Sequence, residues 1–152
     1  MKKLTIGIDL GGTNTKLALI NENGEILRHK KSSTNAELGS EKMIQAIIES
    51  MDQLLENEGV DITSIASVGI GVPGTVNSDT GVVLFAPSIF WENVNVRIPL
   101  EDHFKIPVYV AQDTRAAAWG EYLLFIWSWQ RTSNHSLCNL GYGYWSWFDC
   151  KW

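Results

Sequence analysis

A carboxylate, two glycines and a cation occur close together near the start of the chain, as Asp9, Gly11, Gly12 and Lys16. Gly11 and Gly12 carry no side chain, so their backbone N–H groups can approach an anion closely. Thr13 adds a short hydroxyl group between them and the lysine. Phosphate chemistry needs such exposed amides, a cation and a carboxylate that can hold the water shell of Mg²⁺. We therefore interpret this run as a phosphate-binding segment; an ordinary β-hairpin is the alternative.

A second carboxylate, Asp113, stands between an apolar stretch and a helix-forming stretch that is rich in alanine. The local sequence favours a helix N-cap at this position, because an aspartate there can accept a hydrogen bond from the first turn. A position at the end of a strand would also suit a general base. The two roles are compatible in one side chain.

The elements that must position these residues alternate between strands and helices. Short apolar stretches predict five strands: Leu4–Leu10, Thr15–Asn21, Glu25–Lys31, Ile65–Gly71 and Pro107–Ala111. Apolar residues at three- and four-residue spacing predict an amphipathic helix of about five turns, with Ser40 as its N-cap and its end near Gly59. We expect a loop or hairpin at Asn77–Gly81, a short helix opened by Pro99, and a helix over Thr114–Tyr122. This order predicts an α/β fold, a sheet covered by helices.

The composition of the chain argues against several classes of partner. The chain has 152 residues, 45% of them apolar, which suits about one domain. Its net charge is −5 without a basic cluster, so we expect no nucleic-acid partner. The apolar runs are far shorter than the roughly 20 residues of a membrane span, and no targeting signal is visible. We expect a cytoplasmic protein with no membrane partner.

Four motifs in this order resemble the sugar kinases of the ROK family, especially the bacterial glucokinases. They are Asp9–Lys16, Gly69–Gly74, the segment from Ala86 to Val94, and Asp113–Glu121. The resemblance covers Lys3 to about Leu124. It implies an actin/hexokinase-like (ribonuclease H-type) N-terminal domain over residues 1–124, with a mixed five-stranded sheet and covering helices.

The resemblance implies ATP-dependent phosphorylation of glucose or a related hexose, with ATP and Mg²⁺ as cofactors. Asp113 would be the catalytic base that takes the proton from the attacking sugar hydroxyl. Asp9 would orient Mg²⁺ through water, and the amides from Gly11 to Thr13 would face the nucleotide phosphates. Lys16 is a weaker candidate, since a cation on a half-exposed strand is usually just solvated. The resemblance also implies that a homo-oligomer is possible for the intact family member.

The sugar would lie against Gly71, Pro73 and Gly74, although locally these residues also suit a type II turn. The family usually has Asn where this chain has Ser88 and Gln112. Both still offer a hydrogen-bond donor and acceptor, so sugar phosphorylation is better supported than glucose specificity. A ROK transcriptional repressor is less favoured, because Asp9 leaves no room for an N-terminal helix-turn-helix.

Residues 125–152 differ sharply from the rest of the chain. They hold five of the seven tryptophans and both cysteines: Trp127, Trp129, Trp145, Trp147, Trp152, Cys138 and Cys150. An aromatic ligand-binding segment and a small metal site from His135, Cys138, Asp149 and Cys150 are two interpretations; the second matches no regular zinc pattern, so we assign no metal site.

A third hypothesis explains more of this tail. When Trp127-Ser-Trp129 is written as TGG-AGC-TGG, a shift of one nucleotide downstream gives Gly-Ala-Gly. In the same shifted frame, Leu140–Trp147 is compatible with Leu-Gly-Thr-Gly-Ile-Gly-Ala-Gly, the second phosphate motif of ROK kinases. A frameshift between about Tyr122 and Ile126 would make the tail out of frame. The family's second domain, with its structural zinc site, would then be absent and this chain inactive. A non-catalytic sugar- or partner-binding module with a genuine Trp-rich tail is the alternative.

Overall fold

The computed structural model describes the backbone of residues 4–132 and the side chains of residues 4–123. The Trp-rich tail beyond residue 132, including the metal-site alternative at His135, Cys138, Asp149 and Cys150, lies outside the described residues. None of the helices within the described part has the length and apolar content that crossing a bilayer requires.

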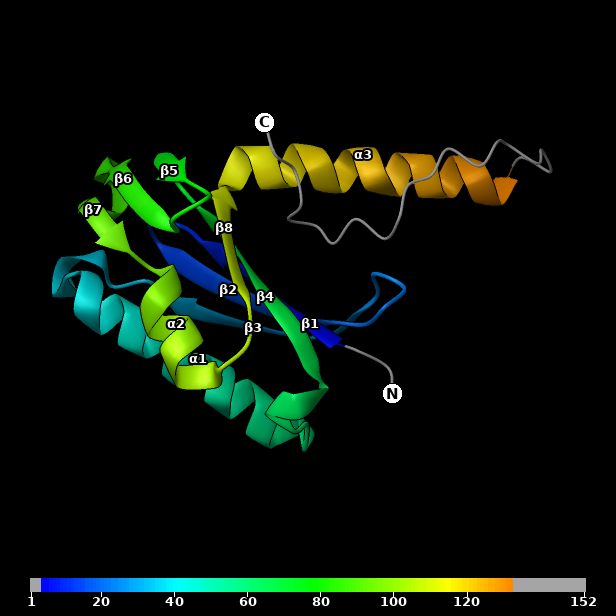
Figure 1. Cartoon of the computed structure of the whole chain (residues 1–152), viewed down its shortest axis with the longest axis horizontal. Helices are drawn as coiled ribbons and strands as arrows, with labels where there is room; N and C mark the ends of the chain where they lie inside the picture. Colours follow the sequence, from blue (N-terminus) through cyan, green and yellow to red (C-terminus); the bar gives the residue numbers. More distant parts are fainter. Residues whose placement is uncertain (1–3, 133–152) are drawn as a thin grey trace.

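The main sheet has five strands: β1 (Leu4–Leu10), β2 (Asn14–Ile20), β3 (Ile26–Ser33), β4 (Ile65–Val72) and β8 (Val108–Gln112). Their order is β3-β2-β1-β4-β8 (Figure 1). The β1–β2 and β2–β3 pairs are antiparallel, whereas β1–β4 and β4–β8 are parallel. The predicted mixed five-stranded sheet is confirmed, and its predicted strands agree to within two residues.

A second, smaller antiparallel sheet has the order β5-β6-β7, with β5 (Thr75–Asn77), β6 (Val82–Ala86) and β7 (Trp91–Asn95). β5 and β6 form a hairpin around Asn77–Gly81, as one of the two expected alternatives for this segment. The strand β7 was not predicted from the sequence. Its first residue, Trp91, is 1% exposed and anchors the small sheet in the core.

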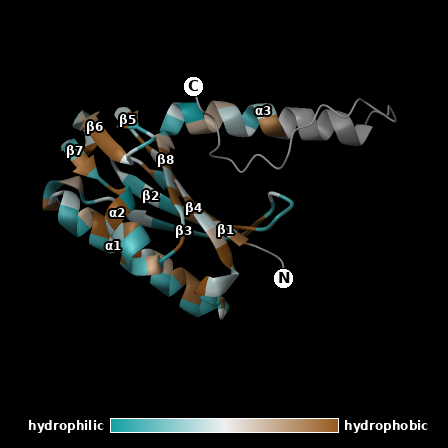
Figure 2. Ribbon diagram, viewed as in Figure 1, coloured by the Kyte–Doolittle hydropathy of each residue, from teal (hydrophilic) through white to brown (hydrophobic). Residues whose placement is uncertain are grey.

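Three α-helices complete the described fold: α1 (Ser40–Glu58), α2 (Arg97–Phe104) and α3 (Asp113–Thr132). Figure 1 shows α1 and α2 together on one face of the main sheet, while α3 starts at the end of β8 and runs away from them. Figure 2 shows hydrophobic and hydrophilic segments alternating along α1. The predicted apolar face of α1 is confirmed, because the seven residues that were predicted to form it are all buried: Met43, Ile44, Ile47, Ile48, Met51, Leu54 and Leu55.

The helix boundaries correct three predictions. Ser40 is the first residue of α1 and not its N-cap; Gly39 takes that place with φ 86° and ψ 164°, a conformation that glycine adopts readily. The helix α2 begins at Arg97, two residues before Pro99. The helix α3 extends to Thr132, beyond the predicted end at Tyr122. The predicted end of α1 is confirmed, since Gly59 caps it in the left-handed conformation.

Candidate active site

The two candidate carboxylates lie at the same edge of the main sheet. Asp9 pairs in register with Gly71 on β4, and Gly71 pairs with Ala111 on β8. Asp113 follows β8 directly as the first residue of α3. Since the carboxyl ends of parallel strands meet at one edge, β1, β4 and β8 deliver Asp9, Gly71 and Asp113 to a single region.

The loop at residues 11–13 joins β1 to β2 as a tight hairpin, so the hairpin alternative describes its backbone correctly. The Gly11 amide donates to the Asn14 carbonyl at 3.0 Å, and a Cβ atom on Gly11 would lie 2.8 Å from that oxygen. The Gly11 amide is therefore already bonded within the turn. Within the described part of the chain, the amides of Gly12 and Thr13 have no such partner. Of the three loop amides that were predicted to face an anion, those of Gly12 and Thr13 are therefore the remaining candidates.

Asp9 and Lys16 form an ion pair beside this loop. They face each other across β1 and β2, with 3.0 Å between Oδ2 of Asp9 and Nζ of Lys16. Both side chains are more than half exposed, at 54% and 60%. A solvated carboxylate next to a cation suits the outer water shell of a divalent ion and the charge of a phosphate. The two predicted residues are thus brought together.

Gly71 and Asp113 also meet. A Cβ atom on Gly71 would lie 3.5 Å from Cα and 3.8 Å from Cβ of Asp113. Asp113 Oδ1 accepts a hydrogen bond from the Thr114 amide at 2.6 Å. An N-cap side chain usually bonds to the second or third residue of its helix, so this bond to the adjacent residue is not a standard cap. It fixes one oxygen of the carboxylate at the start of α3.

The residues predicted to face the sugar come from the small sheet and the ends of the strands. Gly74 has φ 92°, and a Cβ atom there would lie 2.1 Å from the Phe85 carbonyl oxygen. Only a glycine lets the turn after Pro73 pack against the end of β6. Ser88 follows in the short helix Pro87–Ile89. Gln112 ends β8 next to Asp113 and pairs in register with Val72.

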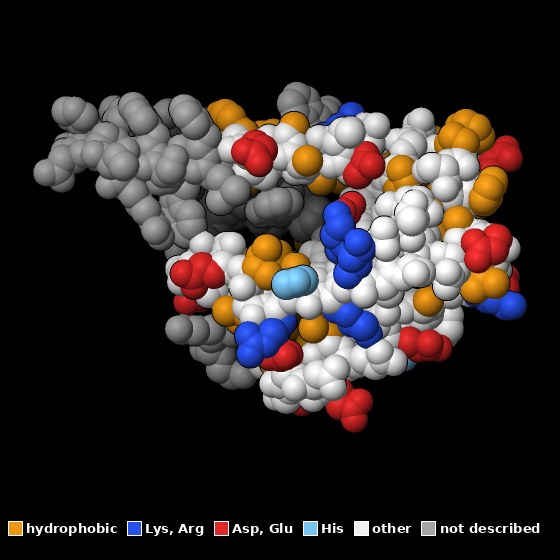
Figure 3. Space-filling view, turned by 180° about the vertical axis from the view of Figure 1, so that it is seen from behind, with side chains coloured by type: hydrophobic (Ala, Val, Ile, Leu, Met, Phe, Trp, Pro, Cys, Tyr) orange, Lys and Arg blue, Asp and Glu red, His pale blue; other side chains and the backbone are white. Residues whose placement is uncertain are grey.

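Two pairs of the candidate residues are in contact in the structure, whereas others are not connected by hydrogen bonds. Gly12 packs against Ser88, and Gly71 packs against Asp113. Across the described residues, no hydrogen bond connects Lys16 to Ser88, Gln112 or Asp113. On the face seen in Figure 3, Lys and Arg side chains lie near the middle and Asp and Glu side chains lie around them, so that face carries mixed charge.

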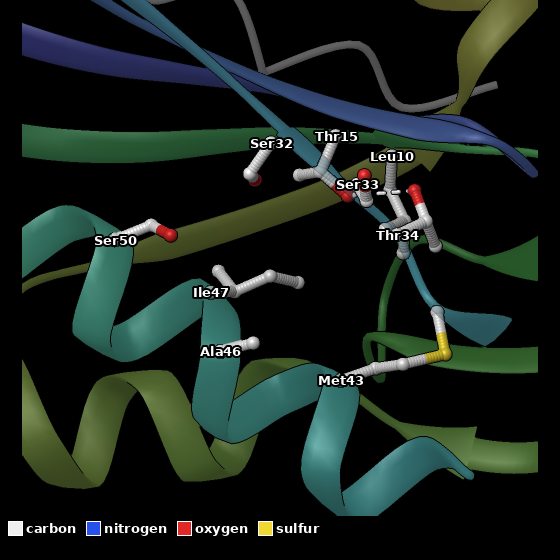
Figure 4. Close-up of a pocket in the computed structure, with 9 residues that line it drawn as sticks. All are labelled: Leu10, Thr15, Ser32, Ser33, Thr34, Met43, Ala46, Ile47 and Ser50. Atoms are coloured by element: carbon white, nitrogen blue, oxygen red, sulfur yellow. Dashed lines mark hydrogen bonds between the residues drawn. The ribbon is translucent and has the colours of Figure 1, made fainter. Parts of the chain in front are cut away.

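Thr34, which lies under the hairpin loop, was not predicted from the sequence as part of the site. Thr34 is 6% exposed, and its backbone amide and its hydroxyl group both donate to loop carbonyls. A threonine after a strand carries no local signal of this role. The nearby cavity lined by Leu10, Thr15, Thr34 and α1 has a volume of about 10 Å³ (Figure 4), too small for a sugar or a nucleotide. The candidate site therefore lies at the ends of the strands and not in this cavity.

Known proteins match most of this chain. A glucokinase of Streptomyces coelicolor is 37% identical over 119 residues, which are 78% of this chain and 35% of that protein. The xylose repressor of Caldicellulosiruptor bescii is 29% identical over 138 residues, 91% of this chain and 34% of the repressor. A crystal structure of a ROK family glucokinase from Streptomyces griseus, in complex with glucose and AMPPNP, gives a TM-score of 0.69 at 38% identity. It covers 78% of this chain and 36% of that one.

These matches confirm the actin-like fold and the predicted resemblance. The chain spans about a third of the length of the curated relatives it matches. The model of the ROK family matches residues 5–143, which extends past Leu124, the predicted end of the resemblance. This match includes every residue of the candidate site, and the chain belongs to the ROK family.

Proposed function

We propose that this chain is the N-terminal lobe of an ATP-dependent sugar kinase that phosphorylates glucose or a related hexose. The observation that carries the proposal is the register that places Asp9 and Asp113 at one sheet edge, on either side of Gly71. The glucokinase structure that resembles this chain holds glucose and AMPPNP, which supports a hexose and a nucleotide as ligands. We also propose a cytoplasmic location, because the chain is similar to bacterial glucokinases.

The residues around the hairpin loop fit a nucleotide phosphate with its magnesium ion. The amides of Gly12 and Thr13 can donate to phosphate oxygens, because they carry no other bond within the described residues. Asp9 is exposed enough to hold the water shell of Mg²⁺, and Lys16 balances its charge. When bound, Mg²⁺ would neutralise charge on the transferred phosphoryl group.

Asp113 is the proposed general base. The Gly71 backbone lies against Asp113, and the Thr114 amide holds Oδ1, so the carboxylate has a defined position. Its other oxygen would accept the proton of the sugar hydroxyl that attacks the γ-phosphate. Base strength matters little in this reaction, because phosphoryl transfer depends mostly on positioning and charge neutralisation.

Ser88 and Gln112 are proposed to contact the sugar hydroxyl groups, with the backbone of Gly71, Pro73 and Gly74 forming one wall. Ser88 has a shorter reach than the Asn usual in the family, whereas Gln112 is one methylene longer. We therefore propose a hexose with glucose as the first candidate, and leave the choice among related hexoses to the assay below.

The polypeptide of 152 residues, taken by itself, is proposed to be inactive. Its candidate site lies at the ends of β1, β4 and β8, where Asp9 and Lys16 are more than half exposed. Without a facing lobe, water is not excluded and ATP is not held against the sugar, so the benefit of positioning is lost.

A coupled assay of ADP release tests the proposal. The 152-residue chain and the chain continued in the shifted frame from about codon 122 would be assayed with MgATP and a panel of hexoses. We expect hexose-dependent turnover only from the shifted-frame protein. Turnover by the 152-residue chain would contradict the proposed inactivity, and absence of turnover from both proteins would contradict the kinase assignment.

A non-catalytic sugar-binding module is the second candidate, favoured by the similarity to a xylose repressor over 91% of the chain. This function predicts sugar binding that does not depend on ATP and a shifted-frame protein without turnover. Calorimetric titration with glucose and xylose, in the presence and absence of MgATP, separates it from the kinase.

A further inference from the structure

Two buried threonines lie directly beneath the hairpin loop. Thr15 and Thr34 are 5% and 6% exposed, and they are the two buried polar residues of the part of the chain that the structure describes. Their hydroxyl oxygens are 3.0 Å apart (Figure 4). Burying a hydroxyl group is costly unless it is fully hydrogen-bonded, so this pair calls for a structural or functional reason.

Thr34 bonds to both ends of the loop. Its backbone amide donates to the Thr13 carbonyl at 3.0 Å, and its Oγ1 donates to the Gly11 carbonyl at 2.7 Å. A hydroxyl group has only one proton, so Thr15 must be the donor in the bond between the two threonines. Thr34 thereby accepts one bond and donates two, and it draws two loop carbonyls inward.

The bond to Gly11 also fixes the direction of the next amide. The carbonyl of Gly11 and the N–H of Gly12 belong to one peptide group, which is planar and trans, since the described chain has no cis peptide bond. In a trans peptide these two groups point in opposite directions. With the Gly11 carbonyl held inward by Thr34, the Gly12 amide must point outward, toward the open edge.

We propose that Thr34 is a positioning residue that aims the Gly12 amide at an anion, which, given the proposed kinase function, is a phosphate group of ATP. The hydroxyl group of Thr34 sets this orientation, and Thr15 completes its hydrogen bonding from below. Gly11 is required as well, because its Cβ would lie 2.8 Å from the Asn14 carbonyl. A second donor on the same loop, the Thr13 amide, would then face the anion beside Gly12.

Variants of the two threonines separate positioning from general stability. Thr34→Val keeps the shape of the side chain but removes the bond to Gly11, so that this peptide group can rotate. Thr15→Val removes an equally buried hydroxyl and the bond between the threonines but leaves Thr34 bonded to Gly11. Thr34→Ser retains the hydroxyl group. All three are made in the 152-residue chain and followed by amide NMR during titration with MgATP and with glucose.

We expect MgATP to shift the Gly12 resonance in the unchanged chain. Thr34→Val should raise the Kd for MgATP by about tenfold, roughly the loss of one charge-assisted hydrogen bond, with the Kd for glucose unchanged within about twofold. Thr34→Ser and Thr15→Val should stay within about twofold of the unchanged chain for both ligands. An unchanged MgATP affinity in Thr34→Val, or an equal loss in Thr15→Val, would overturn the proposal.

Amide exchange in the unchanged chain provides a measurement that needs no variant and no ligand. An outward Gly12 amide should exchange at close to the rate of an unprotected amide, while the bonded Gly11 and Thr34 amides exchange at least about tenfold more slowly. A protected Gly12 amide would overturn the inferred orientation. If the unchanged chain fails to respond to MgATP, the proposed phosphate ligand is wrong, but the exchange rates still decide whether Thr34 orients the loop.

Discussion

The backbone of Gly12 lies against the backbone of Ser88, so closely that a Cβ atom on Gly12 would stand 3.1 Å from the Ser88 carbonyl oxygen. Gly12 belongs to the proposed phosphate-binding loop, and Ser88 is proposed to contact the sugar. The two parts of the candidate site therefore pack directly on each other. We expect a displacement of one part to displace the other, so that the binding of both ligands changes.

Gly12→Ala is expected to weaken both substrates at once. The added methyl group forces the loop or the short helix to move by a few tenths of an ångström, because the contact is with backbone. In the shifted-frame protein, KM should rise by about three- to tenfold for MgATP and for the hexose alike. Ser88→Ala is the comparison variant, because it keeps the backbone contact and removes only the hydroxyl group that is proposed to contact the sugar, so it should raise the KM for the hexose alone. A change in the MgATP constant alone would contradict the coupling of the two segments.

Asp113→Asn tests the proposed base. The amide oxygen of Asn can still accept from the Thr114 amide, so the start of α3 and the stability should be preserved to within about 0.5 kcal/mol. In the shifted-frame protein, kcat should fall by about two or more orders of magnitude while hexose binding persists. Glu121→Gln, on an exposed position of the same helix, should leave kcat within about twofold. Near-normal turnover in Asp113→Asn would reduce Asp113 to a structural residue.

Gly74→Ala tests the close approach of the β4–β5 turn to β6. An alanine here meets both a positive φ and a backbone oxygen at 2.1 Å, so we expect a loss of about 3 kcal/mol or more in the free energy of unfolding. Gly39→Ala is matched in φ but has no atom within 4 Å of the added Cβ, and it should cost about 1–3 kcal/mol from backbone strain alone. Urea denaturation of the 152-residue variants measures both. Equal losses would show that the contact with Phe85 adds nothing.

Lys16→Met distinguishes a phosphate-binding lysine from a solvated one. The ion pair with Asp9 is exposed, so its loss should change the free energy of unfolding by less than about 1 kcal/mol. We expect KM for MgATP in the shifted-frame protein to rise by about three- to tenfold, since a cation is removed and Asp9 is left unbalanced. Lys31→Met is the control, because Lys31 lies opposite Lys16 on β3 and is also exposed. Equal effects of the two variants would indicate a general charge effect.

Local sequence patterns were sufficient for most of the fold. The strand Leu4–Leu10 and the end of α1 at Gly59 follow from apolar periodicity and a glycine that can adopt a positive φ. The strand β7 could not be predicted in this way. It contains Glu92, Asn93 and Asn95, and it is held at the edge of the small sheet by pairing with β6 and by burial of Trp91. Such pairing depends on tertiary structure, which overrides local propensity.

Only part of the candidate site could be predicted, again because some of its contacts depend on tertiary structure. Asp9, Gly12 and Asp113 stand in recognisable motifs, so their types and spacing indicated phosphate chemistry. The bond within the turn that occupies the Gly11 amide depends on backbone geometry, which spacing does not reveal. Thr34 contributes through hydrogen bonds to Gly11 and Thr13, far from it in the sequence. A residue whose role is to orient a distant peptide group carries no local pattern.

The mixed sheet has a consequence for how the chain acquires its parts during synthesis. The hairpin loop, Thr15 and the Asp9–Lys16 pair lie within the antiparallel meander of β1, β2 and β3, and Thr34 directly follows β3. This meander needs only contacts between neighbouring segments. Asp113 reaches the same edge only after β4 has paired with β1 and β8 has paired with β4, across long stretches of chain. Nearby pairings form sooner than distant ones, because closing a long loop costs more entropy. We therefore expect the nascent protein to form the hairpin loop early and to bring Asp113 to it later.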